Sequence, residues 1–180
     1  MEQPCPHSEI GEDTREWMAS LSAGTPPGCF VEVGVYKGGS AWHLARVARA
    51  QGRALYLYDT FSGMPFAEEG DSHRVGDFSA TSLKDVQQAI PDAICVSGVF
   101  PDSLVDMPPV AFAHVDCDQY RSIRDCINEL YHKRMVSGGI MVFDDYPFLP
   151  SAIRAVEEQF GCLLRPGFPL PRTKVYVVKP

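Results

Sequence analysis

Residues 29–40 read CFVEVGVYKGGS, and this stretch decides the fold. An apolar strand runs directly into a glycine-containing turn and then into a helix that starts at Gly39. Gly34 lets the backbone turn tightly, and Gly38 and Gly39 let a ligand approach the main chain. The spacing differs from the dinucleotide motif G-x-G-x-x-G, and Glu32 precedes the turn by two residues. It suits a cofactor with an ammonium and a carboxylate group, although a purely structural turn explains this motif alone equally well.

Outside this stretch, short apolar runs alternate with amphipathic segments. The alternation predicts an α/β domain in which a mostly parallel sheet carries helices on both faces. We expect seven strands, at Cys29–Val33, Ala54–Tyr58, Ala93–Val96, Val110–Val115, Gly139–Phe143, Cys162–Leu164 and Lys174–Val178. Apolar residues recur at helical spacing, which predicts helices at Thr14–Leu21, Gly39–Arg49, Ser82–Ile90, Gln119–Met135 and Ser151–Phe160. The long connection Thr60–Ala80, which contains His73, indicates a functional loop.

Length, composition and charge restrict the partners. The 180 residues are enough for one domain with a continuous core. We expect an N-terminal segment with one short helix over residues 1–28 and the main domain over residues 29–180. The formal net charge of −7 argues against nucleic acid as a partner. No apolar stretch reaches membrane-spanning length, so a membrane partner is not expected either. A small molecule is the expected partner.

The N-terminus and the cysteines favour a cytoplasmic protein. Met1–Gly11 is polar and lacks the basic start and apolar core of a secretory signal. The six cysteines form no C-x-x-C pair and are expected to stay reduced. Cys29, Cys95 and Cys162 lie in apolar runs and are expected in the core. The protein should be stable as a monomer without disulfides, and a homodimer stays an open alternative.

Asp59 ends the second predicted strand. An acid at this place can accept hydrogen bonds from both ribose hydroxyls of a nucleoside. A lone aspartate after a strand is more often a turn or helix-capping residue. The glycine-containing turn at Gly34 favours the ribose interpretation, because both features then belong to one cofactor site.

Four aspartates follow two further predicted strands. Asp116 and Asp118 end one of them, and Asp144 and Asp145 end the next. Neighbouring parallel strands would bring these carboxylates together at the edge of the sheet where open α/β sheets bind ligands. Like charges this close repel each other unless protons or a cation neutralise them. Oxygen ligands favour a hard ion such as Mg2+. Separate structural roles, such as a helix cap at Asp118, explain single residues but not the convergence.

Together these segments resemble the macrocin O-methyltransferase (TylF-type) family, whose members methylate hydroxyls of sugars on natural products. The resemblance runs from about Cys29 to the C-terminus and includes the order and spacing of the segments. It rests on FVEVGVYKGGS, LYDTFSGMP, GDF at 76–78, GVFPDSL at 98–104, HVDCDQYRS at 114–122 and GGIMVFDDY followed by AIRAVEEQF.

The resemblance implies a class I methyltransferase fold, S-adenosylmethionine as the cofactor and Mg2+ or another hard divalent cation as a second cofactor. The implied metal ligands are Asp116, Asp144 and Asp145, and Asp118 is the implied general base. The implied surroundings of the cofactor are Glu32, Gly34, Tyr36, Gly38, Ser40, Asp59, Thr60, Phe61 and Asp116, with Asp77, Phe78, Gly98, Val99 and Phe100 near the adenine.

Three departures from the family pattern concern the details of the site. Val99 stands where an aromatic residue is usual, and His114 stands where a basic residue is usual. His114 itself is expected to pack or hydrogen-bond locally. Most of the N-terminal extension that helps to cover the acceptor in longer relatives is expected to be missing.

The expected reaction is in-line transfer of the sulfonium methyl group to a hydroxyl of a small molecule, such as a sugar, a glycoside, or a vicinal diol or catechol. Three alternatives stay open: an NAD-dependent oxidoreductase, a metal-dependent phosphohydrolase and a homologue that binds cofactor without turnover. The glycine spacing argues against the first alternative, and Glu32 with the turn argues against the second. The intact set of four aspartates argues against the third.

Overall fold

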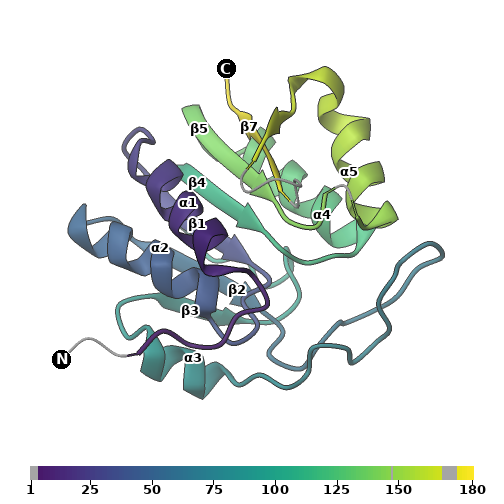
Figure 1. Ribbon diagram of the computed structural model, residues 1–180, viewed down its shortest axis with the longest axis horizontal. Helices are drawn as coiled ribbons and strands as arrows, with labels where there is room; N and C mark the ends of the chain where they lie inside the picture. Colours follow the sequence, from purple (N-terminus) through teal and green to yellow (C-terminus); the bar gives the residue numbers. More distant parts are fainter. Residues whose placement is uncertain (1–3, 147, 168–173) are drawn as a thin grey trace.

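The computed structural model describes residues 4–146, 148–167 and 174–180. In this part of the chain, seven strands form one sheet in the order β3-β2-β1-β4-β5-β7-β6 (Figure 1). Strands β1 to β5 are parallel, and β7 is antiparallel to both β5 and β6. The strands are β1 Cys29–Val33, β2 Leu55–Asp59, β3 Ile94–Ser97, β4 Val110–Val115, β5 Met135–Phe143, β6 Arg165–Pro166 and β7 Val175–Val178. The predicted seven-stranded, mostly parallel sheet is confirmed.

Helices cover both faces of the sheet, as expected. Successive side chains of a strand point to opposite faces, so Phe30 and Leu57 pack into one core and Val31 and Tyr58 into the other. The first core is covered by α1 Glu12–Ala23, α2 Gly39–Ala50 and α3 Leu83–Ala89. The second is covered by α4 Tyr120–Cys126, the π-helical η1 Ile127–His132 and α5 Pro150–Phe160.

Two predicted elements are wrong near the C-terminal half of the sheet. The strand expected at Cys162–Leu164 is replaced by a 3-10 turn, η2 Gly161–Leu163, and the strand β6 follows it. The helix expected at Gln119–Met135 ends at His132, because Met135 pairs with Val110 and begins β5. Strand β5 therefore starts four residues before the Gly139 expected from the sequence.

The cysteines and the membrane expectation can also be compared with the structure. All six cysteines belong to the described residues and are free thiols. Cys29 is buried, but Cys162 is exposed, so its expected place in the core is wrong. No described helix combines the length and the apolar character needed to cross a membrane. The expected signal-free start at Met1–Gly11 includes residues 1–3, which lie outside the described residues.

The long connection between β2 and α3 lacks regular secondary structure, as the sequence predicts. Residues 60–82 are all described and contain no helix or strand. The connection extends away from the sheet beside the ends of the parallel strands (Figure 1). Hydrogen bonds from Met64 N to Asp77 O (2.9 Å) and from Gly76 N to Met64 O (3.0 Å) join its two arms. These hydrogen bonds connect the two arms of the connection beside the carboxyl ends of the parallel strands.

Candidate active site

A cleft of about 470 Å³ opens at the carboxyl ends of β1, β2, β4 and β5. Most of the residues singled out in the sequence line this one cleft: Gly34, Tyr36, Ser40, Asp59, Thr60, Phe78, Gly98, Val99, Phe100, Asp116, Asp118, Asp144 and Asp145. Glu32, Gly38, Phe61 and Asp77 do not belong to its lining. The structure therefore unites the residues of the predicted cofactor site with the four aspartates.

The backbone at this edge of the sheet adopts an unusual conformation after each of four strands. Tyr36 follows β1, Phe61 follows β2, Asp118 follows β4 and Asp145 follows β5, and all four have φ between 50° and 56°. Positive φ is uncommon for residues other than glycine and is concentrated at functional sites. These conformations turn the chain sharply at the end of each strand, so the following side chains lie at the cleft.

Gly34 brings the turn after β1 close to the chain that follows β4. It has φ +89°, and a Cβ atom at this position would lie 1.8 Å from the carbonyl oxygen of Asp116. The turn after β1 therefore approaches the chain after β4 closely enough that only glycine fits. The sequence predicted the tight turn, but it did not predict this contact with Asp116.

Asp59 holds the backbone of the cofactor loop. Its Oδ2 accepts hydrogen bonds from the N–H groups of Val35 (2.7 Å) and Tyr36 (2.8 Å), and its Oδ1 accepts one from Phe61 (2.7 Å). A carboxylate has about four acceptor positions, so roughly one remains for a ligand. Asp59 lines the cleft as expected, and its principal role in this structure is to order the loop.

Glu32 and His114 form a buried polar pair behind the cleft. They are register partners on β1 and β4, and both are 0% exposed. Glu32 Oε1 accepts a hydrogen bond from the Ser40 hydroxyl (2.5 Å) and lies 3.5 Å from His114 Nδ1. Neither ring nitrogen of His114 nor Glu32 Oε2 has a hydrogen-bond partner among the described residues. Glu32 thus fixes the start of α2 through Ser40 instead of reaching into the cleft.

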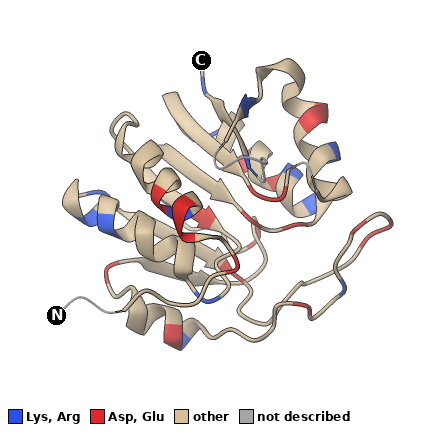
Figure 2. Ribbon diagram, in the orientation of Figure 1, with Lys and Arg blue, Asp and Glu red and all other residues tan. Residues whose placement is uncertain are grey.

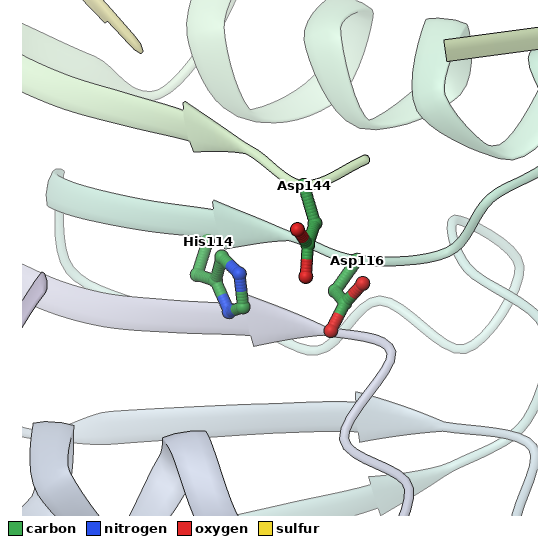
Figure 3. A group of neighbouring side chains, drawn as sticks. All are labelled: His114, Asp116 and Asp144. Carbon is green, nitrogen blue, oxygen red and sulfur yellow. The ribbon is translucent and has the colours of Figure 1, made fainter. Parts of the chain in front are cut away.

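The four aspartates converge as the sequence predicts. Figure 2 shows acidic residues in the segments that follow β4 and β5. Ligand atoms lie within 4.8 Å of one another in two overlapping groups: His114, Asp116 and Asp144, drawn in Figure 3, and Asp116, Asp118 and Asp145. Asp116 belongs to both groups. The geometry brings together oxygen ligands suited to a hard cation.

Burial and mutual repulsion shift the pKa values of these carboxyl groups. Burial, followed by the charges of Asp144 and Asp118, raises the pKa of Asp116 well above its usual range. Burial, followed by the charge and hydrogen bond of Asp145, raises the pKa of Asp118 to about 8. Burial and the charge of Asp144 also raise the pKa of Asp145. Burial and repulsion therefore favour the protonated forms of these three groups, unless a cation neutralises their charges.

Asp144 behaves differently because Lys174 accompanies it. Lys174 is only 2% exposed, lines the cleft and forms an ion pair with Asp144 Oδ1. Burial opposes the ionisation of Asp144, but the charge of the Lys174 ammonium, with that of His114, holds the pKa of Asp144 below its usual value. Lys174 was expected only as the first residue of a strand, with no role in the site.

The long connection contributes a second basic group to the aspartates. His73 Nε2 lies 3.6 Å from Asp118 Oδ2, and His73 Nδ1 lies 3.8 Å from Asp77 Oδ2. The connection is anchored by Asp71 Oδ1, which accepts a hydrogen bond from Tyr120 N at 3.2 Å. The Gln119 side chain also donates to the carbonyl of Phe66. Asp77 therefore lies beside His73, and neither residue belongs to the lining of the cleft.

The N-terminal segment supplies part of the lining that the sequence did not predict. His7, Ser8, Glu9, Ile10 and Gly11 line the cleft. Ser8 Cβ lies 2.4 Å from the position that a Cβ atom on Gly39 would take, so the segment rests directly on the start of α2. The polar sequence of this segment gives no periodic signal, and its place could be recognised only from the fold.

Comparison with known proteins agrees with this geometry. The macrocin O-methyltransferase (TylF) family profile matches residues 11–161. Demethyldecarbamoylnovobiocin O-methyltransferase of Streptomyces niveus is 30% identical over 176 residues, which cover 84% of this chain and 67% of that protein. A tetracenomycin-C 4'-O-methyltransferase of Streptomyces olivaceus, acting on the 8-demethyl-8-(2,3-dimethoxy-alpha-L-rhamnosyl) form, is 33% identical over 142 residues, or 67% of this chain and 53% of that protein.

The fold has a close counterpart among solved structures. The O-methyltransferase NovP superposes with a TM-score of 0.79 and 25% identity, over 96% of this chain and 82% of that one. The sheet order and the cleft at its carboxyl edge define a class I methyltransferase fold. More specifically, the chain belongs to the macrocin O-methyltransferase family, a family of S-adenosylmethionine-dependent enzymes of natural product biosynthesis.

Proposed function

We propose that this protein transfers the methyl group of S-adenosylmethionine to a hydroxyl of a small molecule, with a divalent cation held by the aspartates. The observation that carries the proposal is one cleft with two different halves. One half consists of the glycine-containing loop and Asp59, and the other of four aspartates. An oxidoreductase or a phosphohydrolase would use only one of these halves.

The cofactor would lie across the ends of β1 and β2. Gly34, Tyr36 and Ser40 line the part of the cleft where the methionine portion would bind. Asp59 would accept a ribose hydroxyl at its remaining acceptor position, next to Thr60. Phe78 and the turn Gly98–Phe100 provide apolar and backbone surface for the adenine. Val99 contributes an aliphatic contact to this surface.

The aspartates fit a divalent cation. Burial and mutual repulsion raise the pKa values of Asp116, Asp118 and Asp145, so a bound cation would relieve this repulsion, and oxygen donors suit Mg2+. Following the family resemblance, Asp116, Asp144 and Asp145 would hold the ion. When bound, such an ion lowers the pKa of a substrate hydroxyl and helps to orient it.

Asp118 is the proposed general base. Its side chain lies in the cleft and is 9% exposed, and its backbone is fixed by a hydrogen bond from Ser151 Oγ to Asp118 O (2.5 Å). With a cation in place of the protons of the cluster, the Asp118 carboxylate could accept the hydroxyl proton as the oxygen attacks the methyl carbon from about 3 Å. The remaining contribution of the protein is positioning, through the backbone conformations at the strand ends.

The acceptor is proposed to carry hydroxyl groups on a sugar, a glycoside, or a vicinal diol or catechol. The named substrates of the two sequence relatives support a decorated natural product, because the second name specifies a rhamnosyl group. The long connection around His73 and the N-terminal residues from His7 to Gly11 would border the acceptor. No nucleic acid or membrane is proposed as a partner.

The proposal can be tested without knowing the acceptor. Titration calorimetry should find one S-adenosylhomocysteine per chain and a separate, EDTA-sensitive site for Mg2+. NAD should produce no shift in a melting scan under the same conditions. A library of glycosides and catechols, screened with labelled S-adenosylmethionine, then identifies the acceptor. Absence of binding heat for both S-adenosylmethionine and S-adenosylhomocysteine would overturn the assignment.

A further inference from the structure

The topology of the sheet places Lys174 beside the aspartates. Strand β7 runs antiparallel to β5, and Val175 pairs with Phe143. The residue before Val175 therefore lies next to the residue after Phe143, which is Asp144. Every parallel strand ends at this edge, but β7 begins there. The residue that precedes β7 therefore lies at the same edge as the carboxylates that follow β4 and β5.

The contacts of Lys174 show that it forms an ion pair with one carboxylate of the cluster. Its ammonium pairs with Asp144 Oδ1, which also accepts the N–H of Asp145 at 2.7 Å. A buried ammonium group is stable only when a carboxylate accompanies it. The side chains of Lys174 and Asp144 are 2% and 7% exposed, so water contributes little to this pair.

A second observation indicates that the same cluster accepts further ligands. The His114 ring is fully buried, and both of its nitrogens lack hydrogen-bond partners among the described residues. Figure 3 shows the ring beside Asp116 and Asp144, and ligand atoms of the three residues lie within 4.8 Å of one another. Unpaired buried polar groups are costly, so this arrangement is typical of a site that gains partners when it is filled.

We infer that Lys174 is a resident cation of the carboxylate cluster, which neutralises Asp144 when no metal is bound and competes with the divalent ion for it. This inference rests on the proposed metal site. Two consequences follow from the charges. Lys174 lowers the affinity for the divalent ion, and it stabilises the folded protein in the absence of that ion.

The test is a comparison of Mn2+ binding by calorimetry and electron paramagnetic resonance in wild type and in variants of Lys174 and Lys133. Removing one positive charge a few ångströms from the ion should tighten Mn2+ binding in Lys174→Met by about tenfold or more. Lys174→Arg keeps the charge and should bind within about twofold of wild type. Lys133→Met removes the same charge from the far end of β5, about 30 Å away at roughly 3.3 Å per residue, and should match wild type.

A melting scan provides a second readout if Lys174→Met folds poorly without metal. In EDTA the variant should melt below wild type, and saturating Mn2+ should raise its midpoint more than that of wild type. Lys174→Gln, which also removes the charge, should behave in the same way. Unchanged or weaker Mn2+ binding in both Lys174→Met and Lys174→Gln would overturn the inference while leaving the metal site intact. If no variant, wild type included, binds Mn2+ while S-adenosylhomocysteine still binds, both the metal site and the inference are overturned.

Discussion

The two halves of the cleft differ in how many partners the described residues supply for their carboxyl groups. In the cofactor half, the Asp59 carboxylate accepts three backbone hydrogen bonds of 2.7–2.8 Å, which hold the loop in place. In the aspartate half, Asp116, Asp118 and Asp145 face one another, and burial raises their pKa values. The first half is organised before any ligand binds. The second half is completed only by protons or by a cation.

This difference explains why the two halves should respond differently to mutation. A change in the cofactor half alters a backbone arrangement, so it should affect cofactor binding and stability together. A change in the aspartate half removes charges that repel one another, so it should affect metal binding or catalysis with little loss of stability.

The largest effect is expected for Asp118→Asn. The amide cannot accept the substrate proton, so turnover should fall by about 10²–10⁴-fold. The affinity for S-adenosylhomocysteine and for Mn2+ should stay close to wild type, and excess Mg2+ should not restore turnover. The measurement is a metal titration of activity with an acceptor from the library screen.

The matched variant is Asp145→Asn, which removes a proposed metal ligand. Excess Mg2+ should partly restore its turnover, because mass action refills a weakened site. Restoration of the Asp118 variant by Mg2+, or an unchanged metal affinity in the Asp145 variant, would show that the two roles are assigned to the wrong residues.

Gly34→Ala should break the contact between the two halves. The new Cβ would lie 1.8 Å from Asp116 O at a residue with φ +89°, so the backbone must move. We expect a loss of about 3 kcal/mol or more in the free energy of unfolding, together with loss of cofactor binding. Gly52→Ala is the control: φ is +63°, no atom lies within 4 Å, and the expected cost is about 1 kcal/mol. Urea denaturation measures both, and equal losses would contradict the argument.

Asp59→Ala should weaken cofactor binding by about 1.5–3 kcal/mol, the range for a hydrogen bond to a charged group. Because Asp59 also holds Val35, Tyr36 and Phe61, the variant should melt at a lower temperature than wild type. Calorimetry with S-adenosylhomocysteine and a melting scan measure the two effects. A variant with weaker binding but unchanged stability would show that Asp59 acts on the ribose alone.

The mostly parallel sheet and the convergence of the aspartates could be predicted from the sequence. Parallel strands such as β1 and β4 are buried on both faces and read as apolar runs, and Asp116 and Asp144 follow such runs directly. The predicted element boundaries are wrong where apolar runs no longer mark buried parallel strands. Cys162 lies in an apolar run, but the chain there forms an exposed turn, because the sheet is completed by β6 and β7 instead.

The residues that escaped prediction reach the cleft through tertiary structure. Lys174 arrives there because β7 is antiparallel, and the sequence of a strand does not state its direction. The segment from His7 to Gly11 arrives because it packs on α2. Glu32, which the resemblance places near the cofactor, is fully buried beside its register partner His114 and does not belong to the lining of the cleft.

The remaining effect, a shift of the melting temperature, is expected from pH. Burial raises the pKa of Asp118 to about 8 and that of Asp116 well above its usual range, so the folded protein holds protons that the unfolded chain releases above about pH 4. Stability in EDTA should therefore fall as pH rises from about 5.5 to 8.

Asp144 does not oppose this trend within that range. Lys174 helps to hold the pKa of Asp144 below its usual value, so the stability that Asp144 contributes is complete above about pH 4 and is lost only as pH falls further. Mg2+ should flatten the fall between pH 5.5 and 8, because a bound cation replaces the protons. Asp118→Asn should reduce the slope in EDTA, since the amide does not titrate. Melting scans across this range, with EDTA or Mg2+, provide the measurement. A wild-type midpoint in EDTA that stays level or rises with pH would contradict the view that the aspartate half is incomplete without a cation.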